Sequence, residues 1–172
     1  MASTVIQRRT IMPIFRKGEL FSSKGCIIVT TCSFLTSECK LVMGRGAALQ
    51  LKKKIPGIDR QLGRIILEKY GHLGKYGLII IGKYGIAQVK YRFDEKADPE
   101  LIRYSMDMLK DMAGTEKDRR FNINFPGIGY GGLTKDHVLP LLKKLPRNVT
   151  IWEPKYKIIY PDFYGGGYER HS

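Results

Sequence analysis

Two glycine-rich segments contain residue types that can bind a phosphate group. The first comprises Met43, Gly44, Arg45, Gly46 and Ala47, and a helical pattern follows it directly. Glycines at this position let main-chain N–H groups come close to an anion, and the helix N-terminus adds a partial positive charge. The pattern favours a phosphate site, although a lone Gly-Arg-Gly run is also typical of a turn that only lets a strand and a helix pack.

The second glycine-rich segment lies near the end of the chain. It comprises Gly127, Ile128, Gly129, Tyr130 and Gly131, between a strand pattern and a helical pattern. Its glycines are similar to a dinucleotide-binding fingerprint, but the acidic residue expected about 20 residues further on is missing, which disfavours a Rossmann oxidoreductase. Ligands of open α/β sheets bind beyond the carboxyl ends of the strands, so two such junctions can surround one diphosphate.

The elements that must position these segments alternate along the chain. Apolar runs rich in β-branched residues alternate with helical patterns, which predicts an α/β protein with a layered sheet. We expect strands over residues 26–31, 77–81, 121–125 and 149–152, and further strands over 14–21 and 86–90. Apolar spacing, N-caps at Asp98 and Thr134 and stop signals at prolines predict helices over residues 46–55, 98–112 and 134–145, with a fourth over 58–70.

Length and charge favour one domain with an anionic partner. A chain of 172 residues has room for a single domain, which we expect to span residues 1–172 with a flexible tail from about residue 162. Lys and Arg total 30 against 16 Asp and Glu, a formal charge of +14. Such a surface attracts nucleotides and nucleic acid and disfavours a cationic substrate, but basic compositions also serve solubility alone.

The cysteines and histidines lack the spacing of a disulfide framework or a metal site. The three cysteines lie close together at an odd count, and the three histidines are scattered: Cys26, Cys32, Cys39, His72, His137 and His171. We therefore expect no metal and no cofactor. The sequence shows no signal-like segment and no apolar run near the 18 or so residues that span a bilayer, so we expect a soluble cytoplasmic protein without a membrane partner. No exposed apolar stripe is evident, which favours a monomer.

The two glycine segments together carry a resemblance to a known family. The run VTTCS at 29–33, LVMGRGAALQLKKKIP at 41–56 and, much later, NFPGIGYGGL at 124–133 resemble the macrodomain. The resemblance is to the branch with the terminal ADP-ribose glycohydrolase, the antitoxin that reverses DNA ADP-ribosylation, and small phage and bacterial proteins. It covers about residues 24–152. It implies a three-layer α/β/α sandwich around a mixed, mostly parallel sheet, and ADP-ribose or an ADP-ribosylated macromolecule as the ligand.

The resemblance also implies positions for the ligand. Residues 43–47 match the family loop beside the distal ribose and the diphosphate, and residues 127–131 match the loop whose amides wrap the diphosphate. Tyr130 is expected to pack against the distal ribose, although an aromatic residue in a loop equally often covers a core edge. Cys32 stands where the family usually has an asparagine that contacts this ribose, so the match implies a weaker ribose contact. The adenine position is not readable: Phe125, Trp152 and Tyr156 are possible platforms, and each is equally explained as core.

Lys90 is the candidate catalytic residue. It falls where the hydrolase-like branch has a lysine after a central strand, and an amine with a lowered pKa can attack an anomeric carbon. Lys90 is equally explained as one of many surface cations. The acidic partner of the vertebrate enzyme is missing, because residues 129–134 contain no Asp or Glu. Hydrolysis of an ADP-ribosyl linkage, removal of phosphate from ADP-ribose 1''-phosphate, and binding alone therefore stay open.

The alternative function is a basic nucleic-acid-binding module without ADP-ribose activity. The formal charge of +14 and the run Lys52, Lys53 and Lys54 support it. The two functions are compatible, since an ADP-ribosylated nucleic acid would use both a pocket and a basic surface.

Overall fold

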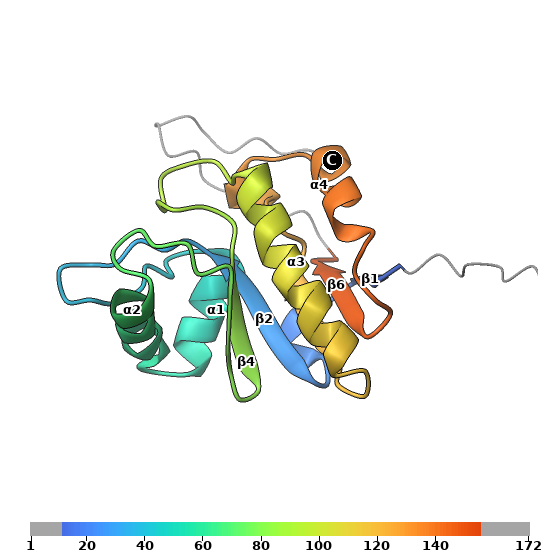
Figure 1. Cartoon of the computed structure of the whole chain (residues 1–172), viewed down its shortest axis with the longest axis horizontal. Helices are drawn as coiled ribbons and strands as arrows, with labels where there is room; N and C mark the ends of the chain where they lie inside the picture. The colour runs from blue at the N-terminus through green and yellow to red at the C-terminus, as the bar shows by residue number, and fades with distance from the viewer. Residues whose placement is uncertain (1–11, 156–172) are drawn as a thin grey trace, which may run out of the picture.

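A computed structural model describes residues 12–155 and shows one six-stranded sheet between two layers of helices (Figure 1). The sheet order is β1-β6-β5-β2-β4-β3, and all neighbouring strands are parallel except β3 and β4. The strands are β1 Ile14–Lys17, β2 Cys26–Thr31, β3 Leu78–Ile81, β4 Tyr84–Gln88, β5 Phe121–Asn124 and β6 Val149–Glu153. The predicted three-layer α/β/α sandwich with a mixed, mostly parallel sheet is confirmed.

The side chains of β2 alternate between the two layers of helices. Ile27 and Val29 pack in one hydrophobic cluster with α1 (Gly46–Lys54) and α2 (Ile58–Lys69). Cys26 and Ile28 pack in a second cluster with α3 (Pro99–Thr115) and α4 (Lys135–Leu142). Because successive strand residues point to opposite faces, a continuous apolar run such as that of β2 requires a sheet covered on both sides. The two layers are separated by the sheet in Figure 1.

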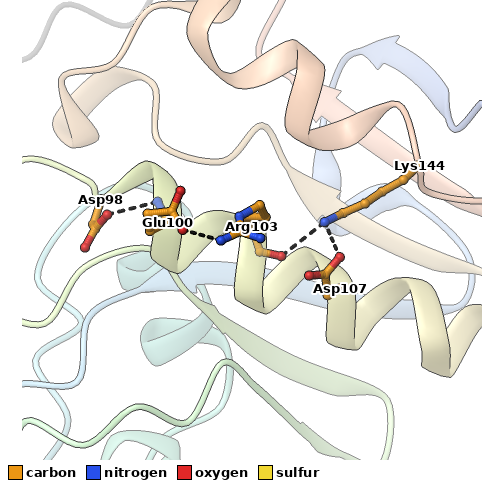
Figure 2. Close-up of polar contacts among 5 residues, drawn as sticks. All are labelled: Asp98, Glu100, Arg103, Asp107 and Lys144. Carbon is orange, nitrogen blue, oxygen red and sulfur yellow. Dashed lines mark hydrogen bonds and ion pairs between the residues drawn. The ribbon is translucent and has the colours of Figure 1, made fainter.

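Helix α3 is well specified by its sequence. Asp98 caps its first turn, where the carboxylate accepts a hydrogen bond from the Glu100 amide (2.9 Å), and Pro99 occupies the first helical position. The outer face carries paired charges, and Figure 2 shows Lys144 reaching from the turn after α4 to the carboxylate of Asp107 and the carbonyl of Arg103. These contacts connect the turn after α4 to α3.

Several of the predicted elements differ in extent, and α3 continues three residues beyond its predicted end, to Thr115. The expected strand over 14–21 ends at Lys17, because the chain turns at Gly18 into a short 3-10 helix over Leu20–Ser22. The expected strand over 86–90 is β4, which starts earlier and ends at Gln88, so that Lys90 lies beyond it. The expected helix to Leu145 ends at Leu142, and its N-cap Thr134 makes no side-chain capping bond.

Within residues 12–155, no helix is long and apolar enough to cross a membrane. The expected tail from about residue 162, and Tyr156, lie outside the described residues.

Candidate functional site

The two glycine segments meet because the strands before them are neighbours. β2 and β5 are adjacent and parallel, with Ile27 opposite Asn122, so their carboxyl ends open on the same edge of the sheet. The first glycine loop (residues 43–47) follows β2 after an excursion that packs on α2, where the Leu41 amide donates to the carbonyl of Asp59 (2.9 Å). The second glycine loop (residues 127–131) follows β5 directly. Both loops then lead to helices, α1 and α4.

One side-chain contact joins the two loops. The guanidinium of Arg45 lies over the ring of Tyr130, with 4.7 Å between the guanidinium carbon and the ring centroid. Arg45 is the N-cap residue of α1, and Tyr130 lies in a one-turn 3-10 helix over Gly129–Gly131. A cation over an aromatic face at this separation is an attractive contact. The glycine loops therefore face one another across a single site.

The first glycine loop keeps open space in front of its backbone. A Cβ placed on Gly44 would meet no atom within 4 Å among the described residues, and the φ of Gly44 is not in the left-handed region. Neither protein packing nor conformation therefore demands a glycine there. The first amide that donates along α1 is that of Leu49, to the carbonyl of Arg45 (3.1 Å). The preceding amides of Gly46, Ala47 and Ala48 have no acceptor within the helix, as at any helix N-terminus.

The second glycine loop is built tightly into the protein. Gly127 and Gly131 are buried, and Gly127 has a φ of +77°. A Cβ on Gly127 would lie 2.7 Å from Cδ1 of Ile102, and one on Gly131 would lie 3.1 Å from Cβ of Ala97. The carbonyl of Gly131 also accepts a hydrogen bond from the Ala97 amide (2.8 Å). These two glycines have a packing role, while Gly129 is exposed.

Lys90 lies close to Arg45 of the first glycine loop. It follows β4, which pairs with β2 on the side away from β5, and its side chain is half-buried and donates to the carbonyl of Glu95 (3.2 Å). Burial is the main cause that lowers the Lys90 pKa below its ordinary value. The charge of Arg45 lowers this pKa further, while a thiolate at Cys32 would raise it. An amine with a lowered pKa beside a guanidinium is suited to attack an electrophile or to bind an anion.

Acidic side chains near Lys90 come from its own segment. Asp94 and Glu95 both act on the Lys90 pKa and raise it. Asp94 is already paired with Arg92, with 3.1 Å between the nitrogen and oxygen atoms. Sequence reasoning examined the second glycine loop for this acid and missed the loop after β4. The sequence positions of Asp94 and Glu95 could have indicated these acids, because residues four and five beyond Lys90 in a short loop can fold back toward the lysine.

Cys32 and Met43 are predicted ligand-binding residues whose side chains are buried in the core. Each is 2% exposed and belongs to the cluster with α1 and α2. Burial raises the pKa of the Cys32 thiol, which keeps it protonated, and its Sγ contacts the carbonyl of Val42 at 3.5 Å. The phenol of the buried Tyr76 donates to the carbonyl of Cys32 (2.9 Å). The thiol and the carbonyl of Cys32 therefore both have hydrogen-bond partners at the end of β2.

A hollow of about 720 Å³ lies at the same edge of the sheet, beyond the carboxyl ends of β1 and β6. It is lined by Trp152 together with residues of the turn after β1, including Lys17, Gly18 and Glu19. Of the three aromatic residues considered for adenine, Trp152 lines this hollow and Phe125 is 3% exposed in the core.

A cluster of aromatic rings and a cation lies in the loops after β2, α2 and β4. The ring of Phe34 contacts the rings of His72 (5.5 Å) and Phe93 (5.0 Å), and the guanidinium of Arg92 lies over it at 5.1 Å. Phe93 is exposed. The run Lys52–Lys54 lies elsewhere, in the last turn of α1, about 10 Å along the helix axis from the first glycine loop.

Comparison with solved structures places this arrangement in a known fold. The chain is similar to the macrodomain of Mycobacterium tuberculosis DarG, with a TM-score of 0.62 and 20% identity over 84% of this chain and 99% of that one. It is also similar to Thermosipho africanus DarTG in complex with ADP-ribose (TM-score 0.63, 19% identity, 86% of this chain), of which it spans 43%, and to the macrodomain of Thermus aquaticus DarG (TM-score 0.57, 21% identity). No protein-family model matches the sequence, and no curated protein is similar to it in sequence. The fold is that of a macrodomain.

Residues 12–155 contain no group of three or more His, Cys, Asp or Glu side chains that could hold a metal ion. The candidate site consists of backbone amides of the two glycine loops and the side chains of Arg45, Tyr130 and Lys90.

Proposed function

We propose that this chain binds ADP-ribose, free or attached to a macromolecule, between its two glycine loops. The observation that carries the proposal is the contact of Arg45 with Tyr130, which brings the two loops to one site. The open space before Gly44 and the first amides of α1 supply the anion-binding surface. One structural neighbour is titled as a complex with ADP-ribose, which supports the same ligand here.

The arrangement favours one orientation of the ligand. The diphosphate would lie between the glycine loops, because backbone amides and a helix N-terminus stabilise its charge. The hollow beside Trp152 is large enough for the adenosine end, and aromatic side chains suit a nucleobase. The distal ribose would then point toward Lys90 and Cys32. We therefore assign the diphosphate to residues 43–47 and 127–131, and the reacting end of the ligand to Lys90.

Calorimetric titration with ADP-ribose at moderate salt tests the proposal. We expect saturable binding, and we expect Gly129→Glu to abolish it, because a carboxylate in the exposed turn at φ +67° would crowd and repel the diphosphate. The matched control is Gly114→Glu, at an exposed position of α3 where an added Cβ meets nothing within 4 Å. The proposal fails if the unmodified protein gives no saturable heat at millimolar ligand, and the assignment of the second loop fails if Gly129→Glu binds normally.

We further propose that Lys90 removes ADP-ribose from a modified macromolecule. The neutral amine forms a bond to the anomeric carbon while the bond to the leaving atom breaks. The leaving atom keeps the electron pair and takes the proton that the nitrogen loses. Water then attacks the same carbon, which releases ADP-ribose and restores the amine. The lowered pKa of Lys90 increases the fraction of neutral amine at a given pH.

A single-turnover assay of Lys90→Met tests this step. We expect release of ADP-ribose to be abolished while ADP-ribose still binds, because the side chain keeps its length and loses its amine. In the unmodified protein the rate should rise with pH and level off below 10.5, the ordinary lysine value, because burial and Arg45 lower the pKa. The same assay with ADP-ribose 1''-phosphate distinguishes phosphatase action. Unchanged turnover in Lys90→Met excludes Lys90 from the mechanism.

A second candidate function is nucleic-acid binding, favoured by the cluster of Phe34, His72, Phe93 and Arg92. Aromatic rings interleaved with a cation suit stacked bases, and the net charge of +14 adds a general attraction. This cluster lies nearer to Lys90 than the run Lys52–Lys54, in which Lys52 is close to Asp59 (3.8 Å). Binding of a single-stranded oligonucleotide should fall steeply with salt and weaken several-fold in Phe93→Ala. Competition with ADP-ribose would show whether both ligands use one site.

A further inference from the structure

We propose that Ala97 is a positioning residue for Lys90, because it joins the segment that carries Lys90 to the second glycine loop. The inference rests on the proposed function and extends it: the loop that would hold the diphosphate and the amine that would react then belong to one structural unit. Their separation matters for a reaction, since a misplacement of about 1 Å can lower a rate about a hundredfold.

The segment over residues 89–98 forms a closed loop. The Asp98 amide donates to the Val89 carbonyl (2.8 Å), so the two ends of the segment meet. Within the same loop, the Lys90 ammonium donates to the carbonyl of Glu95 (3.2 Å). The position of the Lys90 amine therefore depends on where the second half of this loop lies.

Ala97 is the point at which this segment contacts the second glycine loop. It is 4% exposed, and its amide donates to the carbonyl of Gly131 (2.8 Å). A Cβ placed on Gly131 would lie 3.1 Å from Cβ of Ala97, and one on Gly127 would lie 3.5 Å from the same atom. The Ala97 methyl group therefore packs against two glycines of the second loop, with little space for another methyl group between Ala97 and Gly131.

The first half of the segment is fixed to the end of β2. The Val89 amide donates to the carbonyl of Thr31 (3.0 Å), and the amide and hydroxyl of Ser33 both donate to the carbonyl of Tyr91 (3.1 and 3.4 Å). The backbone on either side of Lys90 is thus held by β2, whereas its ammonium is held by the half of the loop that Ala97 anchors. A displacement of Ala97 should therefore move the amine while the backbone of Lys90 stays in place.

The surroundings of Lys90 provide a way to detect such a displacement. Burial is the largest cause that lowers the Lys90 pKa, and the charge of Arg45 lowers it further. A thiolate at Cys32 and the carboxylates of Glu95 and Asp94 act in the opposite direction. Because burial dominates, the titration of Lys90 reports how deeply the loop holds the amine.

Moving one methyl group across the contact tests the proposal. Gly131→Ala crowds Ala97, and the φ of Gly131 is not in the left-handed region, so the backbone accepts an alanine there. The NMR resonance of the Lys90 Cε, assigned with Lys90→Met, gives the titration midpoint without any need for catalysis. We expect this midpoint to rise toward 10.5 in Gly131→Ala, because a displaced loop exposes the amine. It should return to the wild-type value in the double variant Gly131→Ala with Ala97→Gly, which removes the facing methyl group.

Single-turnover release of ADP-ribose at saturating protein gives a second readout, which does not depend on affinity. We expect the rate to fall about threefold or more in Gly131→Ala and to recover in the double variant. Ala97→Val crowds the same contact from the other side and should act in the same direction. Ala113→Val is the matched control, because Ala113 is a fully buried alanine of the same core cluster near the far end of α3. It should lower stability without moving the Lys90 titration.

Thermal unfolding shows whether each variant is folded, and if one of the two crowded variants does not fold, the other decides. An unchanged Lys90 titration on crowding, or a shift that the double variant does not reverse, would overturn the positioning role. A wild-type protein that binds ADP-ribose but releases none from a modified macromolecule would overturn the proposed hydrolysis alone, since the NMR titration still decides whether Ala97 positions Lys90.

Discussion

The two glycine loops look alike in sequence and differ in what requires their glycines. In the first loop, a side chain on Gly44 would meet no protein atom within 4 Å among the described residues. In the second loop, a side chain on Gly127 would collide with Ile102 at 2.7 Å. The backbone of Gly127 also has a φ of +77°, which disfavours any side chain. Gly44 of the first loop leaves open space in front of the backbone. Gly127 of the second loop makes room for the Ile102 side chain in the core.

This difference indicates which substitutions report on function and which report on the fold. A residue that the protein's own packing does not constrain is free to serve a ligand. A residue that the core constrains affects binding only through the shape of the loop. Substitutions at Gly44 should therefore alter affinity without altering stability, and substitutions at the buried positions of the second loop should alter both. Gly46 of the first loop has a left-handed φ of +55°, so substitutions there should also lower stability.

The largest expected effect is that of Gly127→Ala. The methyl group would overlap Cδ1 of Ile102 and lie 3.1 Å from Cδ1 of Leu133, and the left-handed backbone disfavours any side chain. Overpacking and backbone strain together should lower the free energy of unfolding by about 2–4 kcal/mol. Urea unfolding measures this loss. A variant as stable as the wild type would mean that Gly127 is not constrained by the core, and the contrast between the loops would disappear.

The next effect is that of Gly44→Gln, which should act on affinity alone. The side chain would occupy the open space before the α1 amides and compete with the diphosphate, so we expect ADP-ribose to bind at least tenfold more weakly, about 1.4 kcal/mol. The free energy of unfolding should change by no more than about 0.5 kcal/mol. Calorimetry and urea unfolding on the same samples test both halves, with Gly114→Gln as the control at an equally open glycine. Equal affinity in the two variants would contradict the ligand role of the first loop.

The smallest effect concerns the buried network that supports the first loop. The Tyr76 phenol donates to the Cys32 carbonyl at the end of β2, and its loss in Tyr76→Phe should cost about 1 kcal/mol. Burial raises the pKa of both Cys32 and Tyr76, so both groups ionise more readily in the unfolded chain. The contribution of these two groups to stability should therefore be constant below about pH 9, the ordinary thiol value, and should be lost as pH rises further.

The pH dependence offers a control for that network. Tyr76→Phe should lose less stability than the wild type between pH 9 and pH 11, because the phenol no longer contributes to the alkaline loss. Urea unfolding at several pH values measures this difference. An identical alkaline decline in both proteins would show that Tyr76 does not couple to folding through its ionisation.

Much of the fold could be predicted because local signals and burial agree. The β-branched run of β2 predicts a strand buried on both faces, and its bounds, Cys26–Thr31, are confirmed. Asp98 and Pro99 predict the start of α3, and the expected fourth helix is confirmed as α2, Ile58–Lys69. One error concerns the end of the helix after Thr134. The apolar spacing predicted a helix to Leu145, but the helix ends at Leu142, and Leu145 packs in the core from the segment that follows.

The candidate site was less predictable than the fold. Sequence placed both glycine loops after strands, but nothing in it distinguished the constrained Gly127 from the unconstrained Gly44. Lys90 was selected by resemblance, and the acidic side chains that act on its pKa come from the loop after β4, which the sequence analysis did not consider. The carboxylates of Asp94 and Glu95 act on Lys90 because the segment after β4 folds back, and such a path depends on contacts such as that between the Ala97 amide and the Gly131 carbonyl.

By itself the sequence determined the alternation of strands and helices, the helix caps and the two turns in which amides can face an anion, because each depends on residues close together in the chain. Only the tertiary structure decided that β2 and β5 are neighbours, that Arg45 therefore lies over Tyr130, and that Lys90 is half-buried beside Arg45. Those facts depend on strand order and on distances between residues far apart in sequence, and no local pattern encodes either of them.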